Sequence, residues 1–346
     1  MTLPSVRHWQ FDRPGGPEVL RLVEEPRVEP GFGELRLRVE ALSLNRSDLM
    51  FLNDAYVEKP IFPSRFGSEV AGMIEAIGPG VEGFAISDRV ATLNAFAISQ
   101  YGTFGETALI PARAVVPVPD RLTAAEAASF GFAYLTNYFA LFELGHLKPF
   151  QTVLVTAATS TTGLAALPMI RSAGAISIAT TRTIKKRDAL LAHGADHVVV
   201  TDEEDLVARV MEITGGHGAD IAYDCVPATM GMQVVNALKR RGDWIVYGFM
   251  TEPEGFPWWS VAMRTVAFHL YKVSEFAGNP AIGLPGHEEK FIEAKRTIAA
   301  GLKSGRWKPL PIDRQFDGLA CVPEALAYMA SNQATGKIVV TLQATG

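Results

Sequence analysis

The chain has 346 residues, of which 48% are hydrophobic and 20% charged, and its formal net charge is −5. This length exceeds what a single hydrophobic core usually serves, so we expect two domains. The slightly acidic balance argues against a nucleic-acid partner, because binding phosphates requires a concentrated basic surface.

The cysteine content and the N-terminal residues indicate in which cellular compartment the protein is expected. Two cysteines, Cys225 and Cys321, are too few for a disulfide framework or a four-thiolate zinc site. The first residues carry charge and proline where a signal peptide needs an apolar run, and no stretch of about 18 apolar residues occurs. We therefore expect a cytoplasmic protein without a membrane span.

The first third of the chain is rich in short alternating segments. Residues 33–42 place Leu35, Leu37 and Val39 on one face and Arg36 and Arg38 on the other. This period of two predicts a half-buried strand. Similar segments at residues 68–78 and 104–119 are bounded by Gly and Pro, which predicts a β-rich first domain.

The pattern changes after residues 121–129, in which Thr123 and Glu126 have the spacing of a capping box at a helix start. Apolar strands are then expected at residues 152–157, 176–180, 197–200, 220–224 and 243–249. Helices are expected between them at residues 163–173, 185–193, 203–213 and 230–239. Apolar strands separated by helices predict a doubly wound parallel sheet.

A polar helix over residues 286–305 and a final strand over 337–342 follow. That strand needs a partner sheet, and the β-rich domain is the expected host. We therefore expect a discontinuous β-rich domain of residues 1–128 and 274–346, with a nucleotide-binding domain of residues 129–273 inserted.

The turn after the first parallel strand has the spacing of a dinucleotide-binding loop, with Ala157, Ser160 and Gly163 at the three fingerprint positions. Backbone N–H groups at such a helix start bind pyrophosphate. Small residues permit close backbone approach, and the hydroxyls of Thr161 and Thr162 add hydrogen bonds. The loop is also compatible with simple packing, but its place at the start of the first βαβ unit favours a dinucleotide.

The end of the second parallel strand indicates which dinucleotide. An NAD site usually carries a carboxylate there for the ribose 2′-hydroxyl. This chain has Thr181, Arg182 and Lys186 instead, which suit a 2′-phosphate, whereas Lys185 and Arg187 are expected to be solvated. We therefore expect NADPH.

Later strand ends on the same edge are expected to face the cofactor. These positions are Val226, Gly248 and Phe249. Cys225 lies beside them, but no histidine accompanies it in the sequence, so we do not expect a nucleophilic thiol.

Several segments together, including "ALSLNRSDLM", "FGSEVAGMIEAIGPG", "AYLTNYFAL" and "GKIVV", resemble the medium-chain dehydrogenase/reductase superfamily. The similarity is greatest to its zinc-free quinone oxidoreductase and enoyl reductase branch. The resemblance implies a GroES-like β-rich catalytic domain and a Rossmann domain, an α/β fold.

The departures from the zinc-dependent members concern the metal ligands. Asn45 stands where those enzymes have a cysteine, and Ser68 stands where their Gly-His-Glu motif has a histidine. A neutral amide and a hydroxyl are poor zinc ligands. We therefore expect no metal site.

The resemblance also implies roles for individual residues. It makes Tyr56 a candidate proton donor and Asn45 a candidate for orienting the nicotinamide ribose or the substrate. Thr136 matches a threonine that faces the nicotinamide, and Asn332 and Lys337 flank a loop that often touches the cofactor. Asp48 is expected to cap its segment and Glu69 to be a structural acceptor.

These features predict an oxidoreductase that transfers hydride from NADPH to a quinone or an α,β-unsaturated carbonyl. The alternatives are a zinc-type alcohol dehydrogenase and an NADPH-binding sensor with little turnover. Trp258 and Trp259 belong to an apolar segment that either lines the acceptor pocket or forms a dimer surface, and we expect a homodimer. The sequence leaves the acceptor open.

Overall fold

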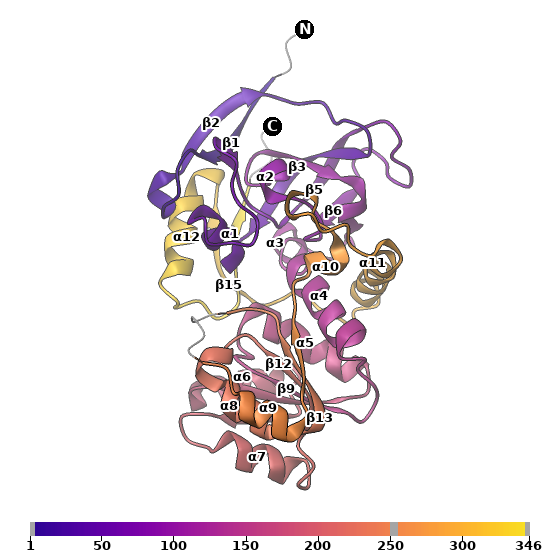
Figure 1. Ribbon diagram of the computed structural model, residues 1–346. Coiled ribbons are helices and arrows are strands. Elements are labelled where there is room, and N and C mark those ends of the chain that lie inside the picture. The colour runs from indigo at the N-terminus through magenta and orange to yellow at the C-terminus, as the bar shows by residue number, and fades with distance from the viewer. Residues whose placement is uncertain (1–3, 250–254, 343–346) are drawn as a thin grey trace. The chain divides into compact units, whose positions relative to one another are not determined.

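The computed structural model describes residues 4–249 and 255–342, which form two compact units (Figure 1). Unit 1 comprises the residues up to Leu135 and those from Ser274 onward, and unit 2 comprises Thr136–Val273. The division falls inside helix α4 (Gly131–Tyr138). No helix among the described residues is long and apolar enough to cross a bilayer.

Unit 1 is built mainly of strands, as its alternating sequence predicts. Its strands are β1 (Ser5–Phe11), β2 (Arg21–Pro26), β3 (Glu34–Ser43), β4 (Ser64–Arg65), β5 (Val70–Ile77), β6 (Arg89–Thr92), β7 (Thr107–Pro111), β8 (Val115–Pro117), β15 (Ile312–Asp317) and β16 (Lys337–Thr341). Its helices are α1 (Arg46–Leu52), α2 (Ile98–Tyr101), α3 (Ala124–Ala127), α10 (Ser274–Ala277), α11 (Glu288–Lys303) and α12 (Val322–Ala330).

The main sheet of unit 1 has the strand order β15-β16-β3-β5-β6-β8, with β7 paired to β3. Strand β16 is antiparallel to β3 and pairs Val340 with Leu42. The final strand therefore joins the sheet formed by the first third of the chain, as expected. A second sheet has the order β2-β1-β4.

The predicted alternation of buried and exposed side chains along β3 holds for its apolar face but not for every residue of the opposite face. Leu35, Leu37 and Val39 are buried, but Arg36 is buried too, at 7% exposure. Its guanidinium donates from Nε to Glu75 Oε1 at 2.6 Å and from Nη1 to the carbonyl of Val28. On this second face Arg36 is thus buried as a paired charge, whereas Arg38 is partly exposed.

Unit 2 alternates strands and helices. Its strands are β9 (Thr152–Val155), β10 (Ile176–Thr181), β11 (His197–Val200), β12 (Ala219–Asp224), β13 (Leu238–Val246) and β14 (Ala267–Leu270). Its helices are α5 (Thr161–Ser172), α6 (Arg187–Ala192), α7 (Leu206–Ile213), α8 (Pro227–Ala237) and α9 (Trp258–Arg264), and a π-helical segment covers Phe139–Leu144.

All six strands of unit 2 are parallel, in the order β11-β10-β9-β12-β13-β14. The chain starts in the middle, moves outward through β10 and β11, and returns to the other side of β9. This is the doubly wound order of dinucleotide-binding folds, and its topological switch point lies between β9 and β12.

The predicted elements of unit 2 are all present, with shifted ends. Helix α8 begins at Pro227, earlier than expected, because proline fits the first helical position. Strand β13 begins at Leu238, directly after that helix. The sequence analysis missed β14, whose pattern of exposed residues does not alternate clearly.

Candidate functional site

The loop between β9 and α5 has the geometry of a phosphate-binding turn. Ser160 caps α5, and its Oγ accepts a hydrogen bond from Gly163 N at 3.1 Å. The first N–H groups of a helix have no partner within the helix, and the helix dipole favours an anion there. Helix α5 has twelve residues, so this dipole is fully developed.

Ala157 and Gly163 show why the loop needs small residues. Ala157 has φ +43°, a left-handed conformation that a side chain disfavours. At Gly163 a Cβ would lie 2.7 Å from Cα of Ala158, so only glycine allows this contact between helix and turn. The third glycine of a dinucleotide-binding fingerprint serves this close packing of the helix, so Gly163 fits that position.

The switch point is held by a buried carboxylate that the sequence analysis missed. Asp224 ends β12 and accepts hydrogen bonds from Thr156 Oγ1 at 2.5 Å, Val226 N at 2.9 Å and Trp244 Nε1 at 2.9 Å. Burial raises the pKa of Asp224, and these hydrogen bonds oppose the rise. Asp224 therefore joins the ends of β9 and β12 next to the loop.

Thr180 contributes a second constraint on the loop, because its Oγ1 accepts from Ala157 N at 3.2 Å. Beyond Thr180 the end of β10 carries the basic residues. Arg182 is exposed and Lys186 is partly exposed, and no described carboxylate pairs with either of them. Both cations are thus available to a 2′-phosphate, whereas Thr181 is buried and its Oγ1 donates weakly to Thr183 O at 3.4 Å.

The remaining expected cofactor residues of unit 2 are spread along its strand ends. Val226 precedes α8, Gly248 is partly exposed, and Phe249 is 47% exposed. Thr136 is buried, and its carbonyl accepts from Tyr271 Oη at 3.0 Å. Contact between these residues and a cofactor stays a prediction.

Cys225 is chemically quiet in this environment. Burial raises the pKa of its thiol to about 11, so the thiolate is scarce at neutral pH. The thiolate is the reactive form of a cysteine, so a nucleophilic role for Cys225 stays unexpected.

Unit 1 contains a buried charged cluster that includes Asn45, one of the two positions that differ from the zinc enzymes. Lys337 Nζ donates to Glu69 Oε2 at 2.5 Å and to Asn45 Oδ1 at 2.8 Å, and Asn45 Nδ2 donates to the same Glu69 oxygen at 2.9 Å. The side chains of Lys337 and Glu69 are 0% and 2% exposed. Glu69 Oε1 accepts from Phe132 N at 2.8 Å, which confirms its structural role.

This network determines which hydrogen-bonding groups of Asn45 remain available to a ligand. Its oxygen is held by a cation and one of its N–H groups by a carboxylate, so at most one N–H is left for a ligand. Lys337 is wholly engaged inside the protein. Asn45 and Lys337 therefore have established partners of their own, besides any contact with cofactor.

Asp48 lies beside this cluster. Its Oδ2 accepts from Asn45 N at 2.7 Å and its Oδ1 from Ser68 Oγ at 3.1 Å. Burial raises the pKa of Asp48 to about 7, opposed by these hydrogen bonds and by the charge of Lys337. Asp48 thus pins the start of α1, as expected.

The donor chemistry here does not fit zinc. Among the described residues no group of three or more His, Cys, Asp or Glu side chains is arranged to hold a metal ion. Asn45 and Ser68 are weak donors, and the ammonium of Lys337 already neutralises Glu69. A second cation at this position would face electrostatic repulsion from Lys337.

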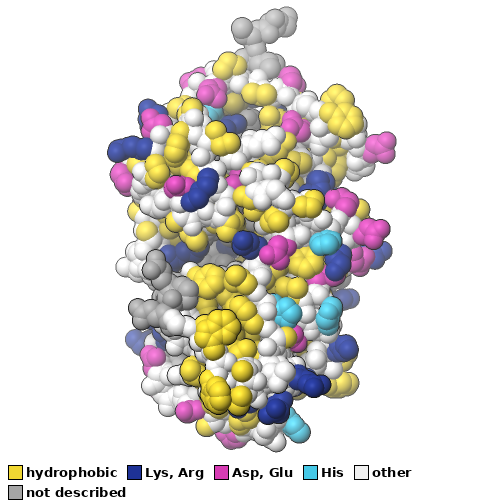
Figure 2. Space-filling view, in the orientation of Figure 1, with side chains coloured by type: hydrophobic (Ala, Val, Ile, Leu, Met, Phe, Trp, Pro, Cys, Tyr) yellow, Lys and Arg dark blue, Asp and Glu magenta, His cyan; other side chains and the backbone are white. Residues whose placement is uncertain are grey.

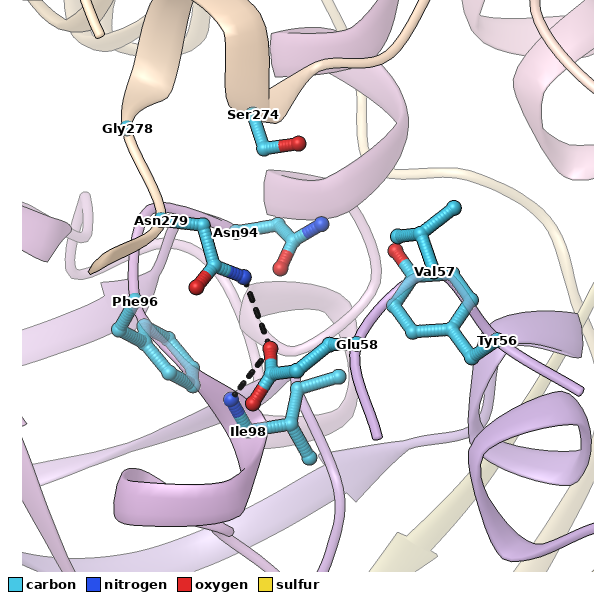
Figure 3. A pocket seen from close by; sticks show the side chains of 9 residues that line it. All are labelled: Tyr56, Val57, Glu58, Asn94, Phe96, Ile98, Ser274, Gly278 and Asn279. Carbon is cyan, nitrogen blue, oxygen red and sulfur yellow. Dashed lines mark hydrogen bonds between the residues drawn. The ribbon is translucent and has the colours of Figure 1, made fainter. Parts of the chain in front are cut away.

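Tyr56 lines a small pocket of unit 1 together with Glu58, Asn94, Ser274 and Asn279 (Figure 3). Burial raises the pKa of Tyr56 to about 12, and the polar side chain of Asn94 in the same pocket opposes the rise. The phenol therefore keeps its proton throughout the physiological range.

Asn332 lies elsewhere in unit 1. It is exposed, has φ +60°, and its Oδ1 accepts a hydrogen bond from Arg46. Sequence reasoning missed Asn94, Glu58, Asp224 and Thr156. A polar residue at or just after the end of an apolar strand was the available signal for Asn94, Asp224 and Thr156, whereas nothing local marked Glu58.

Two family models match the chain. One is the alcohol dehydrogenase GroES-like domain, over residues 31–120, and the other is the zinc-binding dehydrogenase, over residues 161–277. The first match lies in unit 1, and the second lies almost wholly in unit 2.

The chain is also similar to characterised proteins. It is 29% identical to a phenolphthiocerol/phthiocerol polyketide synthase of Mycobacterium tuberculosis, over 97% of this chain but only 15% of that protein. It is 31% identical to the quinone oxidoreductase of Salmonella typhimurium, over 86% of this chain and 87% of that protein.

Among solved structures, the quinone oxidoreductase of Escherichia coli complexed with NADPH matches with a TM-score of 0.83 and 26% identity, over 97% of this chain and 99% of that one. The chain belongs to the medium-chain dehydrogenase/reductase superfamily, in its quinone oxidoreductase-like branch.

Proposed function

We propose that the protein is an NADPH-dependent, zinc-independent oxidoreductase that reduces a quinone or an α,β-unsaturated carbonyl. The observation that carries the proposal is the buried Lys337–Glu69–Asn45 cluster, in which a neutral amide stands at the position of a zinc-ligating cysteine and the neighbouring carboxylate is already paired with an ammonium. Without a Lewis acid, the stabilisation of an alkoxide during alcohol oxidation is lost. Acceptors that delocalise negative charge do not need it.

NADPH fits unit 2 on three features. The closed position at Gly163 and the left-handed Ala157 form a turn that admits a pyrophosphate, and Arg182 and Lys186 are available for a 2′-phosphate. The similar quinone oxidoreductase of Escherichia coli was solved with NADPH. When bound, NADPH supplies a hydride to the acceptor.

The chain's own residues then complete the reduction. Hydride addition to a conjugated carbonyl places negative charge on the carbonyl oxygen and the α-carbon, and one proton is needed to finish the product. Tyr56, which is protonated at neutral pH, donates that proton and is restored from solvent. A quinone takes up the same hydride and proton to give a hydroquinone, and solvent can supply that proton.

The first test is NADPH oxidation by chelator-treated protein, with quinones and conjugated enones offered in parallel and NADH as the control. Turnover with NADPH and no metal supports the proposal. Activity that returns only with zinc and an alcohol would establish a zinc-type alcohol dehydrogenase. Tight NADPH binding without turnover on any acceptor would indicate a sensor.

We also propose that two copies associate through unit 2. Strand β14 is at the edge of the sheet, and its Phe268 and Leu270 are 40% and 52% exposed. Trp258 and Trp259 of α9 are 73% and 74% exposed, and Figure 2 shows apolar side chains gathered over this region. An exposed apolar strand edge favours pairing with a second strand.

Sedimentation at several protein concentrations tests this association. We expect a dimer for the unaltered chain and a monomer when Leu270 is changed to Lys, since a charge on an edge strand prevents pairing. A dimer that persists in Leu270→Lys would place the interface elsewhere.

A further inference from the structure

The loop that carries Tyr56 is attached to the rest of unit 1 at few points. Residues 53–63 are mostly exposed, and Glu58, at 1% exposure, is the one buried residue among them. Within the described part of the chain, residues 56–63 form no hydrogen bond between backbone groups. The ring of Phe62 packs edge-on against Phe11, with ring centroids 5.6 Å apart. The place of this loop therefore depends on its side chains.

Glu58 attaches the loop through hydrogen bonds from two distant segments. Its Oε1 accepts from Ser99 N at 2.7 Å and from Ser99 Oγ at 2.6 Å. Its Oε2 accepts from Ile98 N at 3.1 Å and from Asn279 Nδ2 at 2.8 Å, and Figure 3 shows these two bonds as dashed lines. Each carboxylate oxygen thus accepts two bonds, from partners that are 40 to 221 positions away in the chain.

The partners of Glu58 all donate, which explains why a carboxylate is needed. Ile98 and Ser99 are the first two residues of α2, and their N–H groups have no acceptor within the helix. Asn279 is 6% exposed, and its Oδ1 already accepts from Ala281 N at 3.0 Å, so its Nδ2 needs an acceptor elsewhere. A glutamine in place of Glu58 would offer one oxygen and would turn its own N–H groups toward other donors.

This attachment lies next to the phenol. Glu58 follows Tyr56 by two residues, and both line the same small pocket (Figure 3). A segment with few backbone hydrogen bonds and few buried contacts opens at a low free-energy cost. A proton donor must lie within about 2.6–3.2 Å of the atom that it protonates, and a misplacement of about 1 Å can cost roughly 100-fold in rate. The place of the Tyr56 loop therefore matters for proton transfer.

We propose that Glu58 is a positioning residue, which ties the Tyr56 loop to α2 and to Asn279 and thereby holds the phenol in place for the acceptor. The inference rests on the proposed function, because it takes Tyr56 as the proton donor, but the attachment exists without turnover. Glu58 exchanges no proton in the reaction. The proton passes from Tyr56 Oη to the reduced acceptor, and solvent restores it.

The attachment is tested without the reaction. In Glu58→Gln at least one backbone amide of Ile98 and Ser99 loses its acceptor, and we expect its hydrogen exchange, followed by NMR, to become about tenfold faster or more. A ring-fluorinated tyrosine placed only at position 56 should give one sharp fluorine resonance in the unaltered chain and a broadened or divided one in the variant. Glu82→Gln, which removes an exposed carboxylate of unit 1, should change neither. An unaltered fluorine resonance in Glu58→Gln would overturn the proposal.

Kinetics test the consequence for the reaction. We expect Glu58→Gln to lower kcat for an enone about tenfold or more, with little change in the KM for NADPH or in the reduction of a quinone. Ser99→Ala removes one of the four bonds and should lower the same kcat about two- to fivefold, so it serves as the milder variant if Glu58→Gln fails to fold. Equal losses for enone and quinone would indicate damage to the whole fold and contradict a positioning role.

A Tyr56→Phe background separates this proposal from the proposed function. Without the phenolic proton, Glu58→Gln should lower kcat for an enone no further, because Glu58 acts through Tyr56. Losses that add in the double variant would mean that Glu58 acts by another route, which refutes the proposal. If Tyr56→Phe alone leaves enone reduction unchanged, the proton-donor role fails together with its kinetic consequence, whereas the fluorine resonance still decides whether Glu58 holds the loop.

Discussion

The phosphate-binding turn of unit 2 and the charged cluster of unit 1 are held in place by different kinds of interaction. The turn is formed by residues 155–163, adjacent in sequence, and it depends on the left-handed backbone at Ala157, on the missing side chain at Gly163 and on nearby hydroxyl groups that accept from its backbone. The cluster joins Asn45, Glu69 and Lys337, whose side chains come from distant parts of the chain and are fully charged or polar. In the turn, a substitution that adds side-chain volume at Gly163 is not tolerated, whereas substitutions at exposed positions are. In the cluster, the loss of any one side chain leaves its partners without a bond.

The largest effect on stability is expected from Lys337→Met, which removes the cation from the charged cluster of unit 1. The change leaves the carboxylate of Glu69 buried without its cation, and such a loss costs about 3–5 kcal/mol of stability. Chemical denaturation measures it. Adding Glu69→Gln should recover part of the loss, and Lys185→Met, at an exposed site, should cost almost nothing. Equal stability of Lys337→Met and the unaltered chain would mean that the ion pair is not energetically coupled to the fold.

The unfolding free energy measured as a function of pH tests Asp48, which lies beside the charged cluster of unit 1. Its pKa is about 7 in the folded chain and near 3.9 when unfolded, so the folded state retains a proton that the unfolded chain loses. This contribution is fully present below about pH 4 and is lost as the pH rises to about 7, by roughly 4 kcal/mol in total. The unfolding free energy of the unaltered chain minus that of Asp48→Asn should fall over this range and be level above it. A flat difference would mean that the pKa of Asp48 is the same in the folded and the unfolded chain, so that burial does not raise it.

Arg182→Ala tests the one part of the backbone-built site that depends on charge. A charge-assisted hydrogen bond to a phosphate is worth about 1.5–3 kcal/mol, which corresponds to roughly 10- to 100-fold in affinity. We expect the Kd for NADPH to rise by that factor while the Kd for NADH hardly changes, as measured by calorimetry. Arg187→Ala is the matched control and should affect neither cofactor. Equal losses for NADPH and NADH would refute the assignment of Arg182 to the 2′-phosphate.

The smallest effect is expected from Ala157→Gly, which relieves the backbone strain at φ +43°. Glycine adopts this conformation without steric cost, so the folded state gains up to about 1 kcal/mol, offset in part by the freer unfolded chain. Thermal unfolding measures the change, with Ala173→Gly, at the end of α5 and φ −81°, as a control that should only destabilise. A loss of stability in Ala157→Gly would show that the methyl group contributes contacts larger than the strain.

The sequence predicts local features better than distant ones. The fingerprint spacing at Ala157, Ser160 and Gly163 and the apolar strands identified the doubly wound sheet, because both signals lie within short windows. The partner of Lys337 could not be predicted in this way, since Glu69 is 268 positions away and the pairing depends on β16 entering the sheet beside β3. The pairing of Glu58 is equally non-local, because its four hydrogen bonds come from Ile98, Ser99 and Asn279, which are 40 to 221 positions away.

The place of Lys337 on β16 has a consequence for how the protein is made. Ribosomes synthesise the chain from the N-terminus to the C-terminus, and domains generally fold as units during synthesis. The residues of unit 2 are complete before residue 337 is synthesised, whereas Asn45 and Glu69, made early, must wait for the lysine of a strand near the end of the described chain. The nucleotide-binding half can therefore become native while unit 1 still lacks the cation that pairs with Glu69, so unit 1 is the last to mature.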